Sequence, residues 1–267
     1  MNSLTAKLGV FLIGALIIMA LFSSFIAKHD PNTFHLDDKF AAPSHEYWFG
    51  NDVDGRDVFS RIVYGSRTSL GIGIAVVSIS MIFGTLIGLI VGWFGGWLER
   101  VFHFIFDIFL AFPSFLFAIA IAAFLRPSII NVILILSLKG WVSYARLVRG
   151  QVLTLKNREY ILASEAIGVS LPRLFFRHLL PNMVGPLVVN ASFGMAGVIM
   201  IESALSFLGL GVPIDTPSWG AMLDQGTQYL FIDPMLSIIP GIFIMLVVVG
   251  FNFLGDGLRD KLAPRGR

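Results

Sequence analysis

Six apolar stretches dominate the sequence, and each is long enough to cross a lipid bilayer as a helix. The hydrocarbon layer of a bilayer is about 30 Å thick, which corresponds to about 20 helical residues. The stretches cover residues 8–27, 69–95, 101–125, 128–147, 182–208 and 235–255. Only 13% of the residues are charged, against about 25% in soluble domains. We therefore expect an all-α integral membrane protein, and the formal net charge of +2 gives no support to a nucleic-acid partner.

The first apolar stretch shares with a signal peptide a basic residue, Lys7, in front of it. Its apolar run is longer than the roughly 7–15 residues of a signal-peptide core, and no small-residue cleavage motif follows. We therefore expect residues 1–27 to form a retained first transmembrane helix. The sequence contains no cysteine, which excludes disulfides and thiolate metal sites.

The distribution of Lys and Arg predicts the orientation of the spans. Six basic residues lie between positions 146 and 177 and four lie in the tail 256–267, whereas residues 209–234 contain none. Short connections rich in Lys and Arg stay in the cytoplasm. The sequence therefore predicts that both termini and the tail are cytoplasmic, that residues 28–68 form an external loop, and that residues 69–255 form a five-helix core.

Two spans carry features that predict their packing. Gly84, Gly88 and Gly92 recur every four residues in the second span, the small-residue spacing that lets two membrane helices approach closely. Pro113 interrupts the third span, and a proline is tolerated there when neighbouring groups satisfy the freed carbonyl. We expect an interface helix in the second span and a kink in the third.

The connection at residues 156–181 is unusual because it predicts two short helices outside the membrane. Gly168 suits the left-handed position that ends a first helix, and Ser170 can cap a second one. Pro181 predicts the end of that second helix, since the residue before a proline disfavours helical angles. An apolar stripe at helical spacing comprises Leu171, Leu174, Phe175 and His178. Such an amphipathic segment either lies on the lipid surface or docks in a groove of a cytosolic partner.

The stretch REYILASEAIGVSLPRLFFRHLLPN, residues 158–182, resembles the EAA loop of permease subunits in binding-protein-dependent ABC importers. Gly168, Leu180 and Pro181 occupy positions of that motif, while Leu162 replaces the glutamate that gives the loop its name. The resemblance implies that the loop couples the permease to a cytosolic ATPase. The residues to which it assigns this role are Glu159, Ala163, Ser164, Glu165, Gly168, Val169, Leu174 and Phe175.

Five further segments extend the resemblance over nearly the whole chain: FGNDVDGRDVFSRIVYGSRTSLGIG, AFPSFLFAIAIA, WVSYARLVRGQVL, ESALSFLGLGVPIDTPSWGAML and FNFLGDGLRDKLAPR. They are similar to the second permease subunit of the dipeptide, oligopeptide and nickel group. The resemblance implies a type I ABC importer permease fold in the inner membrane. It also implies half of a translocation pathway for small solutes, either di- and oligopeptides or nickel and other metal chelates. The implied partners are a second homologous permease, two ATP-binding subunits and an extracytoplasmic solute-binding protein.

The sequence lacks the motifs of an enzyme. No Gly is followed by Lys, so a P-loop is absent and ATP is expected to bind to the partner subunits. NASFG at residues 190–194 has Asn where a G-x-S-x-G nucleophile elbow begins with Gly. NDVDGRD at residues 51–57 lacks the final glutamate of a calcium loop, and a polar turn is expected there. We therefore expect a non-catalytic subunit with no cofactor of its own.

Asp107 and Glu202 are acidic residues expected within the spans. An ionised acid near the centre of a bilayer costs about 2.5–3.5 kcal/mol, so both should face protein or water. They indicate either hydrogen bonds inside the bundle or a proton pathway, and the second option describes an ion-coupled secondary transporter. His103 is one helical turn from Asp107, where the two can pair, but one pair is too few ligands for nickel and we expect no bound metal. Lys139 is expected near the cytoplasmic end of its span, reaching toward the interface.

Overall fold

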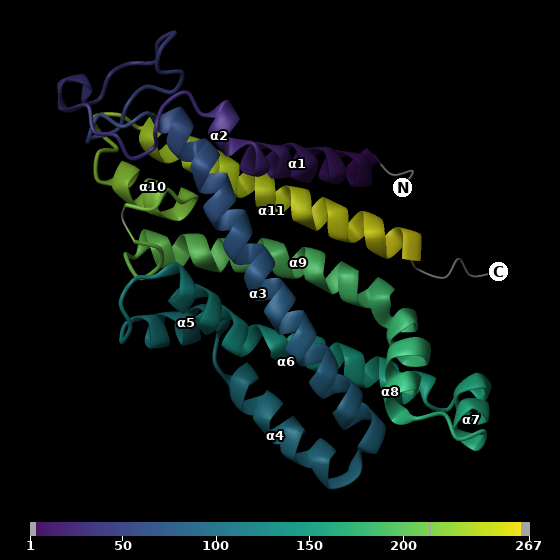
Figure 1. Ribbon diagram of the computed structural model, residues 1–267. Coiled ribbons are helices and arrows are strands. Elements are labelled where there is room, and N and C mark those ends of the chain that lie inside the picture. The colour runs from purple at the N-terminus through teal and green to yellow at the C-terminus, as the bar shows by residue number, and fades with distance from the viewer. Residues whose placement is uncertain (1–3, 214, 263–267) are drawn as a thin grey trace.

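The computed structural model describes residues 4–213 and 215–262, which form helices that run between two ends of the molecule (Figure 1). This described part contains no β-strand, and its isolated β-bridge joins Asn51 to Asp57. The longer helices are α1 (Leu4–Leu21), α3 (Val58–Phe94), α4 (Gly96–Ala111), α6 (Ile129–Leu155), α9 (Leu180–Phe207) and α11 (Met235–Leu262). The shorter segments are α2 (Ser23–Ile26), η1 (Leu36–Asp38), α5 (Ser114–Ala122), α7 (Glu159–Ala166), α8 (Leu171–Arg173), η2 (Leu174–Leu179) and α10 (Trp219–Thr227).

Five helices are long and apolar enough to cross a membrane: α1, α3, α6, the continuous helix 171–207 that contains α9, and α11. The third span was predicted to kink at Pro113, and the chain does bend there, by 82° between the two helices α4 and α5. Phe112 and Pro113 have extended ψ angles of 131° and 135°, as expected for a proline and the residue before it. The Nζ of Lys139 donates a hydrogen bond to the carbonyl of Phe112, the residue directly before the proline. The described helices thus supply five spans, or six if the bent pair counts as one.

Several predicted helix boundaries lie further out in the structure. α3 begins at Val58 rather than at 69, because the Asp57 carboxylate accepts hydrogen bonds from the backbone N–H groups of Phe59 and Ser60 and caps the helix. The external loop predicted at 28–68 therefore ends before α3, eleven residues early. α6 and α11 also run past the ends predicted at 147 and 255. At 37 residues, α3 is about 55 Å long and projects beyond the hydrocarbon layer.

α3 and α6 form the most extensive helix pair, along the glycine positions predicted to be an interface. A Cβ atom on Gly88 would lie 2.6 Å from the Ala145 carbonyl oxygen and 2.8 Å from the Val148 Cβ. Comparable crowding occurs at Gly84 and Gly92. α6 thus touches the backbone of α3 directly, and the predicted small-residue interface is confirmed.

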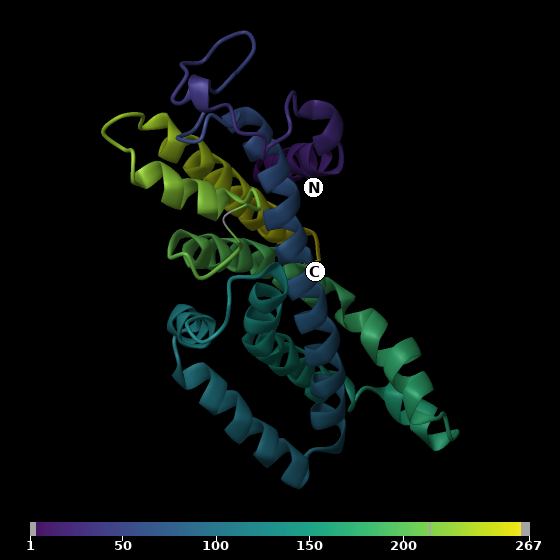
Figure 2. The same cartoon turned by 60° about the vertical axis from the view of Figure 1, so that its left-hand side comes forward.

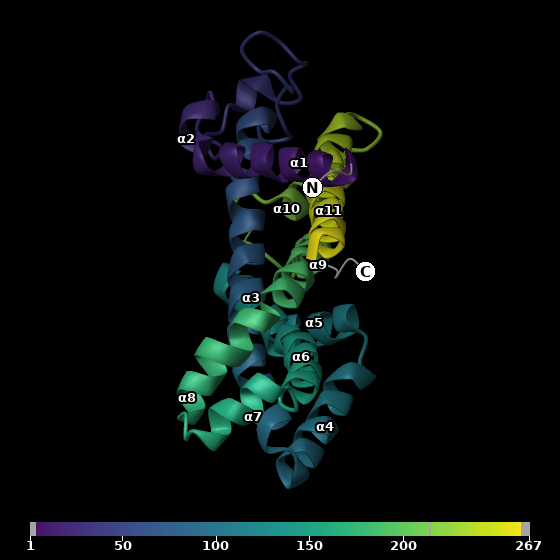
Figure 3. The same ribbon diagram turned by 90° about the vertical axis from the view of Figure 1, so that its right-hand side faces the viewer.

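The two ends of the molecule carry different elements. α7, the described start of α1 and the described end of α11 lie on one side, while α2, α10 and the loop before α3 lie on the other (Figure 1). α1 packs against α11, and α11 packs against α9 (Figure 3). This arrangement agrees with the predicted orientation, in which both termini share a side with the connection at residues 156–181.

At the end opposite α7, buried charges tie the loop before α3 to α10. The Asp52 carboxylate accepts hydrogen bonds from the Arg56 Nε at 2.9 Å and from the Arg61 Nη1. Gln225 on α10 accepts hydrogen bonds from the same two arginines, at 2.9 and 3.1 Å. Both guanidinium groups are almost fully buried. The segment 51–57, expected to be a polar turn, is therefore part of a buried ion-pair cluster that fixes α10.

Candidate functional site

The connection after α6 forms a short helix, α7, that ends at Gly168 as predicted. Gly168 has a φ of +76°, a left-handed conformation that glycine adopts without a clash of its own side chain. Its N–H donates to the Glu165 carbonyl at 2.9 Å, and the Val169 N–H donates to the Ser164 carbonyl at 3.0 Å. These two bonds are those of a Schellman cap. The cap fixes the direction in which the chain leaves α7.

The sequence predicted that the second helix of the connection would end before Pro181. This prediction is wrong, because the helix continues into α9. Helical structure is unbroken over residues 171–207, and η2 is a π-helix, in which each N–H bonds five residues back. The wider π-turn accommodates Pro181, which has no N–H and whose ring clashes with the preceding turn of an α-helix. The Ser170 side chain, expected to cap this helix, makes no capping hydrogen bond. The connection is therefore directly continuous with a membrane span.

Two of the four residues in the predicted apolar stripe, Leu174 and Phe175, pack against other parts of this chain. Leu174 is fully buried, and the ring of Phe175 packs edge-on against Trp93 near the end of α3, with ring centroids 5.7 Å apart. Ile161 of α7 is also fully buried. These contacts hold the connection against α3. Leu174 therefore packs inside this chain, while Phe175 is half-buried against Trp93.

The opposite face of α7 is apolar and exposed. Tyr160, Ala163 and Ile167 lie at positions i, i+3 and i+7, along one side of α7. Ile167 is 81% exposed and Tyr160 is 44% exposed. We call these three residues the α7 surface. Isolated exposed apolar residues are ordinary, whereas a contiguous apolar patch indicates a site of interaction.

The charged residues of α7 itself are acidic, while the exposed residue that precedes it, Arg158, is basic. Glu159 and Glu165 are exposed on α7, and this helix contains no Lys or Arg. A helix that lies on anionic lipid has Lys and Arg on its polar face, so the charge of α7 does not favour a lipid surface. Figure 2 shows α7 at the tip of a projection from the bundle. Of the two options left open by the sequence, the arrangement favours the groove of a protein partner.

The acidic candidates within the spans do not come together. Glu202 on α9 is fully buried, and its carboxylate accepts a hydrogen bond from the Ser206 hydroxyl at 3.0 Å. Asp107 on α4 is exposed and shares no hydrogen bond with Glu202. The expected pairing of His103 with Asp107 is wrong, because the His103 Nε2 lies 4.0 Å from the Glu99 carboxylate instead. The geometry gives no support to an ion-coupled transporter that would use both acids.

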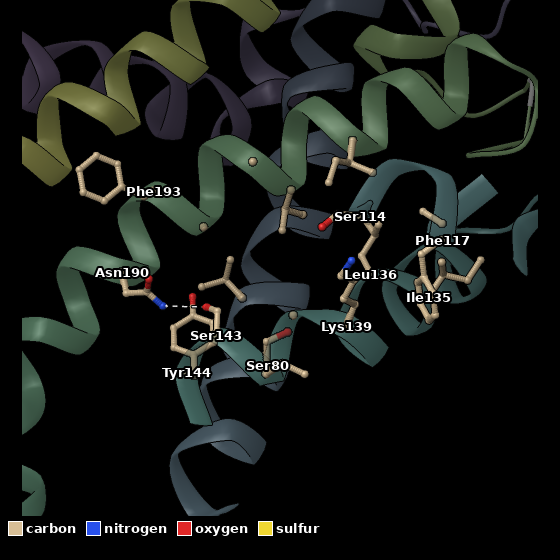
Figure 4. Close-up of a pocket in the computed structure, with 18 of the residues that line it drawn as sticks. Ser80, Ser114, Phe117, Ile135, Leu136, Lys139, Ser143, Tyr144, Asn190 and Phe193 are labelled. Carbon is tan, nitrogen blue, oxygen red and sulfur yellow. Dashed lines mark hydrogen bonds between the residues drawn. The ribbon is translucent and has the colours of Figure 1, made fainter. Parts of the chain in front are cut away.

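A cavity of about 380 Å³ lies among α3, α6, α9 and the α4–α5 bend (Figure 4). Its polar lining residues are Ser80, Ser114, Lys139, Ser143, Tyr144 and Asn190. Lys139 is the eleventh residue of the 27-residue α6, about 15 Å along the helix from its first residue. The prediction that it lies near the cytoplasmic end is therefore wrong. Hydropathy alone could not reveal the cavity, because it is enclosed by helices far apart in the sequence.

Comparison with known proteins identifies relatives of the whole chain. Residues 84–267 match the family described as binding-protein-dependent transport system inner membrane component. The dipeptide transport system permease protein DppC of Alkalihalophilus pseudofirmus is 42% identical over 260 residues, which is 97% of this chain and 86% of that one. The oligopeptide transport system permease protein OppC of Bacillus subtilis is 39% identical, over 98% and 86% of the two chains. The glutathione transport system permease protein GsiD of Pectobacterium atrosepticum is 40% identical, over 96% and 85%.

A solved structure of the MetNI methionine ABC transporter in an inward-facing conformation contains a chain of the same fold. The TM-score is 0.62 at 20% sequence identity, and the match covers 77% of this chain and 97% of that one. The predicted type I ABC importer permease fold is thereby confirmed. The apolar spans and the family match make this a multi-pass protein of the inner membrane. The chain belongs to the family of binding-protein-dependent transport system inner membrane components, as the sequence resemblance predicted.

Proposed function

We propose that the chain is a permease subunit of an ABC importer that carries peptides. The relatives named above serve dipeptide, oligopeptide and glutathione transport, at 39–42% identity. All three solutes contain amide-linked amino acids, which supports the peptide class rather than nickel or metal chelates. In this proposal a second homologous permease completes the translocation pathway. Two cytosolic subunits bind and hydrolyse ATP, and an external solute-binding protein delivers the peptide.

The observation that carries this proposal is the α7 surface, an exposed apolar face on a helix that projects from the bundle. It suits a helix-in-groove contact with an ATPase subunit. The Schellman cap at Gly168 and the packing of Phe175 on Trp93 connect α7 firmly to α9 and α3. Movement of the ATPase subunits would therefore be transmitted to two membrane spans. We infer that this movement switches the pathway between its inward and outward openings.

Ile167→Asp in the assembled transporter tests this docking. Burial of an isoleucine side chain is worth about 1.5–3 kcal/mol, and a buried unpaired charge adds a further cost. ATPase binding should therefore weaken at least about tenfold. The measurement is the amount of ATPase subunit that co-purifies with the permease pair, together with peptide uptake into proteoliposomes.

The matched control is Phe231→Asp, an exposed apolar residue in the connection that follows α10, the helix at the end opposite α7. This variant introduces the same charge and should keep the ATPase subunits bound. Unchanged ATPase binding by Ile167→Asp would contradict the proposal.

A further inference from the structure

The cavity among α3, α6, α9 and the α4–α5 bend contains a single charged residue, Lys139. Its Nζ donates a hydrogen bond to the Phe112 carbonyl and lies 5.8 Å from the centre of the Phe117 ring. None of the ion pairs formed within the described residues includes Lys139. A carbonyl and an aromatic ring are neutral partners, so the positive charge has no countercharge within the described chain. A cation at this depth of a membrane protein is expected to face a functional partner.

Two hydroxyl groups in the same cavity also lack partners. Ser80 is 2% exposed and Tyr144 is 3% exposed, and neither hydroxyl makes a hydrogen bond within the described residues. Buried polar groups are nearly always hydrogen-bonded, so an unpaired one calls for a partner such as water or a ligand. Figure 4 shows both residues together with Lys139 around one space between α6 and α9.

Small residues of α9 keep this space open. A Cβ atom on Gly194 would lie 2.9 Å from the Tyr144 hydroxyl, whereas nothing lies within 4 Å of a Cβ on Gly197. Beyond them, the Asn190 amide donates to the Ser143 hydroxyl at 3.1 Å. The cavity volume of about 380 Å³ is within the range of about 300–1,000 Å³ for pockets that bind small ligands. The space therefore combines room for a ligand with one cation and polar groups on four helices.

We propose that this cavity binds the carboxylate end of the solute during translocation, with Lys139 as its countercharge and the hydroxyls of Ser80 and Tyr144 as partners for adjacent polar groups. The inference rests on the proposed function, because every linear peptide has a terminal carboxylate whatever its side chains. Peptides of different sequence can therefore all make a contact through the terminal carboxylate. A carboxylate forms a charge-assisted hydrogen bond, which is stronger than one to a neutral carbonyl. The solute therefore competes successfully with Phe112 for the Nζ of Lys139.

Three substitutions of Lys139 separate its charge from its hydrogen bond to Phe112. Lys139→Arg keeps both, Lys139→Gln keeps a donor without the charge, and Lys139→Met removes both. We expect uptake of trialanine by the complete transporter in proteoliposomes to fall at least about tenfold in Lys139→Gln and Lys139→Met, and to stay within about threefold of wild type in Lys139→Arg. ATP hydrolysis stimulated by the solute-binding protein should persist in all three. Wild-type uptake by Lys139→Gln would overturn the inference, because a neutral donor would then be sufficient.

A second measurement detects the charge without depending on transport. In a cysteine-free transporter, Gly197→Cys places one thiol in the open part of the cavity. The ratio of its modification rates with negatively and positively charged methanethiosulfonate reagents should fall at least about tenfold when Lys139→Gln is added, since the attraction for the anionic reagent is lost. An unchanged ratio would overturn the inference.

The two proposals fail in different ways. Loss of the ATPase subunits from the wild-type permease pair would count against the proposed function alone. Wild-type behaviour of Lys139→Gln in an assembled, ATP-hydrolysing transporter would count against the cavity site alone. Absence of trialanine uptake by the wild-type transporter would overturn the peptide cargo and, with it, the peptide carboxylate in the cavity.

Discussion

Gly88→Ala perturbs the contact between α3 and α6 at one point. The added Cβ would lie 2.6 Å from the Ala145 carbonyl oxygen and 2.8 Å from the Val148 Cβ, whereas ordinary contacts begin near 3.4 Å. The helices must therefore separate by about 0.8 Å at this point, which also loosens the packing on either side. Both obstacles are attached to the backbone of α6 and cannot rotate away. Overpacking of this kind costs about 1–3 kcal/mol.

Gly71→Ala on the same helix is the matched control, because nothing lies within 4 Å of the added Cβ. Alanine is more favourable than glycine inside a helix by about 0.5–1 kcal/mol, so this variant should be slightly stabilised. The free energy of unfolding is measured in mixed micelles of increasing SDS content by tryptophan fluorescence. Because the gain from replacing a helical glycine applies to both variants, Gly88→Ala should be less stable than Gly71→Ala by the overpacking cost alone, about 1–3 kcal/mol. Equal stabilities would refute the backbone contact between α3 and α6.

Two other sites give sharp expectations. Asp52→Asn should lower the free energy of unfolding by about 3–5 kcal/mol, because it leaves Arg61 buried without its carboxylate. Asp54→Asn should lower the free energy of unfolding by no more than about 1 kcal/mol, because the Asp54 side chain is 35% exposed. Equal losses of stability for Asp52→Asn and Asp54→Asn in the SDS titration would contradict this expectation. Gly168→Ala should cost about 1–2 kcal/mol through its positive φ alone, since its Cβ meets no neighbour. Backbone amide hydrogen exchange in residues 159–179 should be faster in Gly168→Ala than in wild type, with a smaller increase in Gly168→Asn. Exchange rates identical to wild type in both variants would argue against a strained cap.

The long helices could be predicted from the sequence because they depend on local composition. The glycine spacing in α3 also identified its interface, since small residues at every fourth position form a shallow groove along one face, into which a second helix fits. The early start of α3 had a local signal in Asp57, a good N-cap residue in front of an apolar run. Hydropathy masked this signal, because residues 58–68 contain two arginines and resemble a loop in composition.

Features that depend on distant residues could not be predicted. At the 82° bend between α4 and α5, Lys139 of α6 donates a hydrogen bond to the Phe112 carbonyl, and hydropathy cannot predict this contact between distant residues. Within the stripe at residues 171–178, the direction of Phe175 depends on Trp93 of α3, which packs against it. Both faces of α7 are apolar, so only the tertiary structure distinguishes the buried Ile161 from the exposed neighbours on the α7 surface.

Docking of α7 on an ATPase subunit is tested most directly by the reactivity of one thiol. Because the chain has no native cysteine, Ile167→Cys in a cysteine-free transporter provides a single probe on the α7 surface. Its reaction rate with a water-soluble maleimide is compared between membranes that contain the permease pair alone and membranes that also contain both ATPase subunits. We predict a rate at least about tenfold lower in the complete transporter, with no change for Phe231→Cys at the opposite end. Equal rates for Ile167→Cys with and without the ATPase subunits would contradict the claim that this chain meets its ATPase through α7.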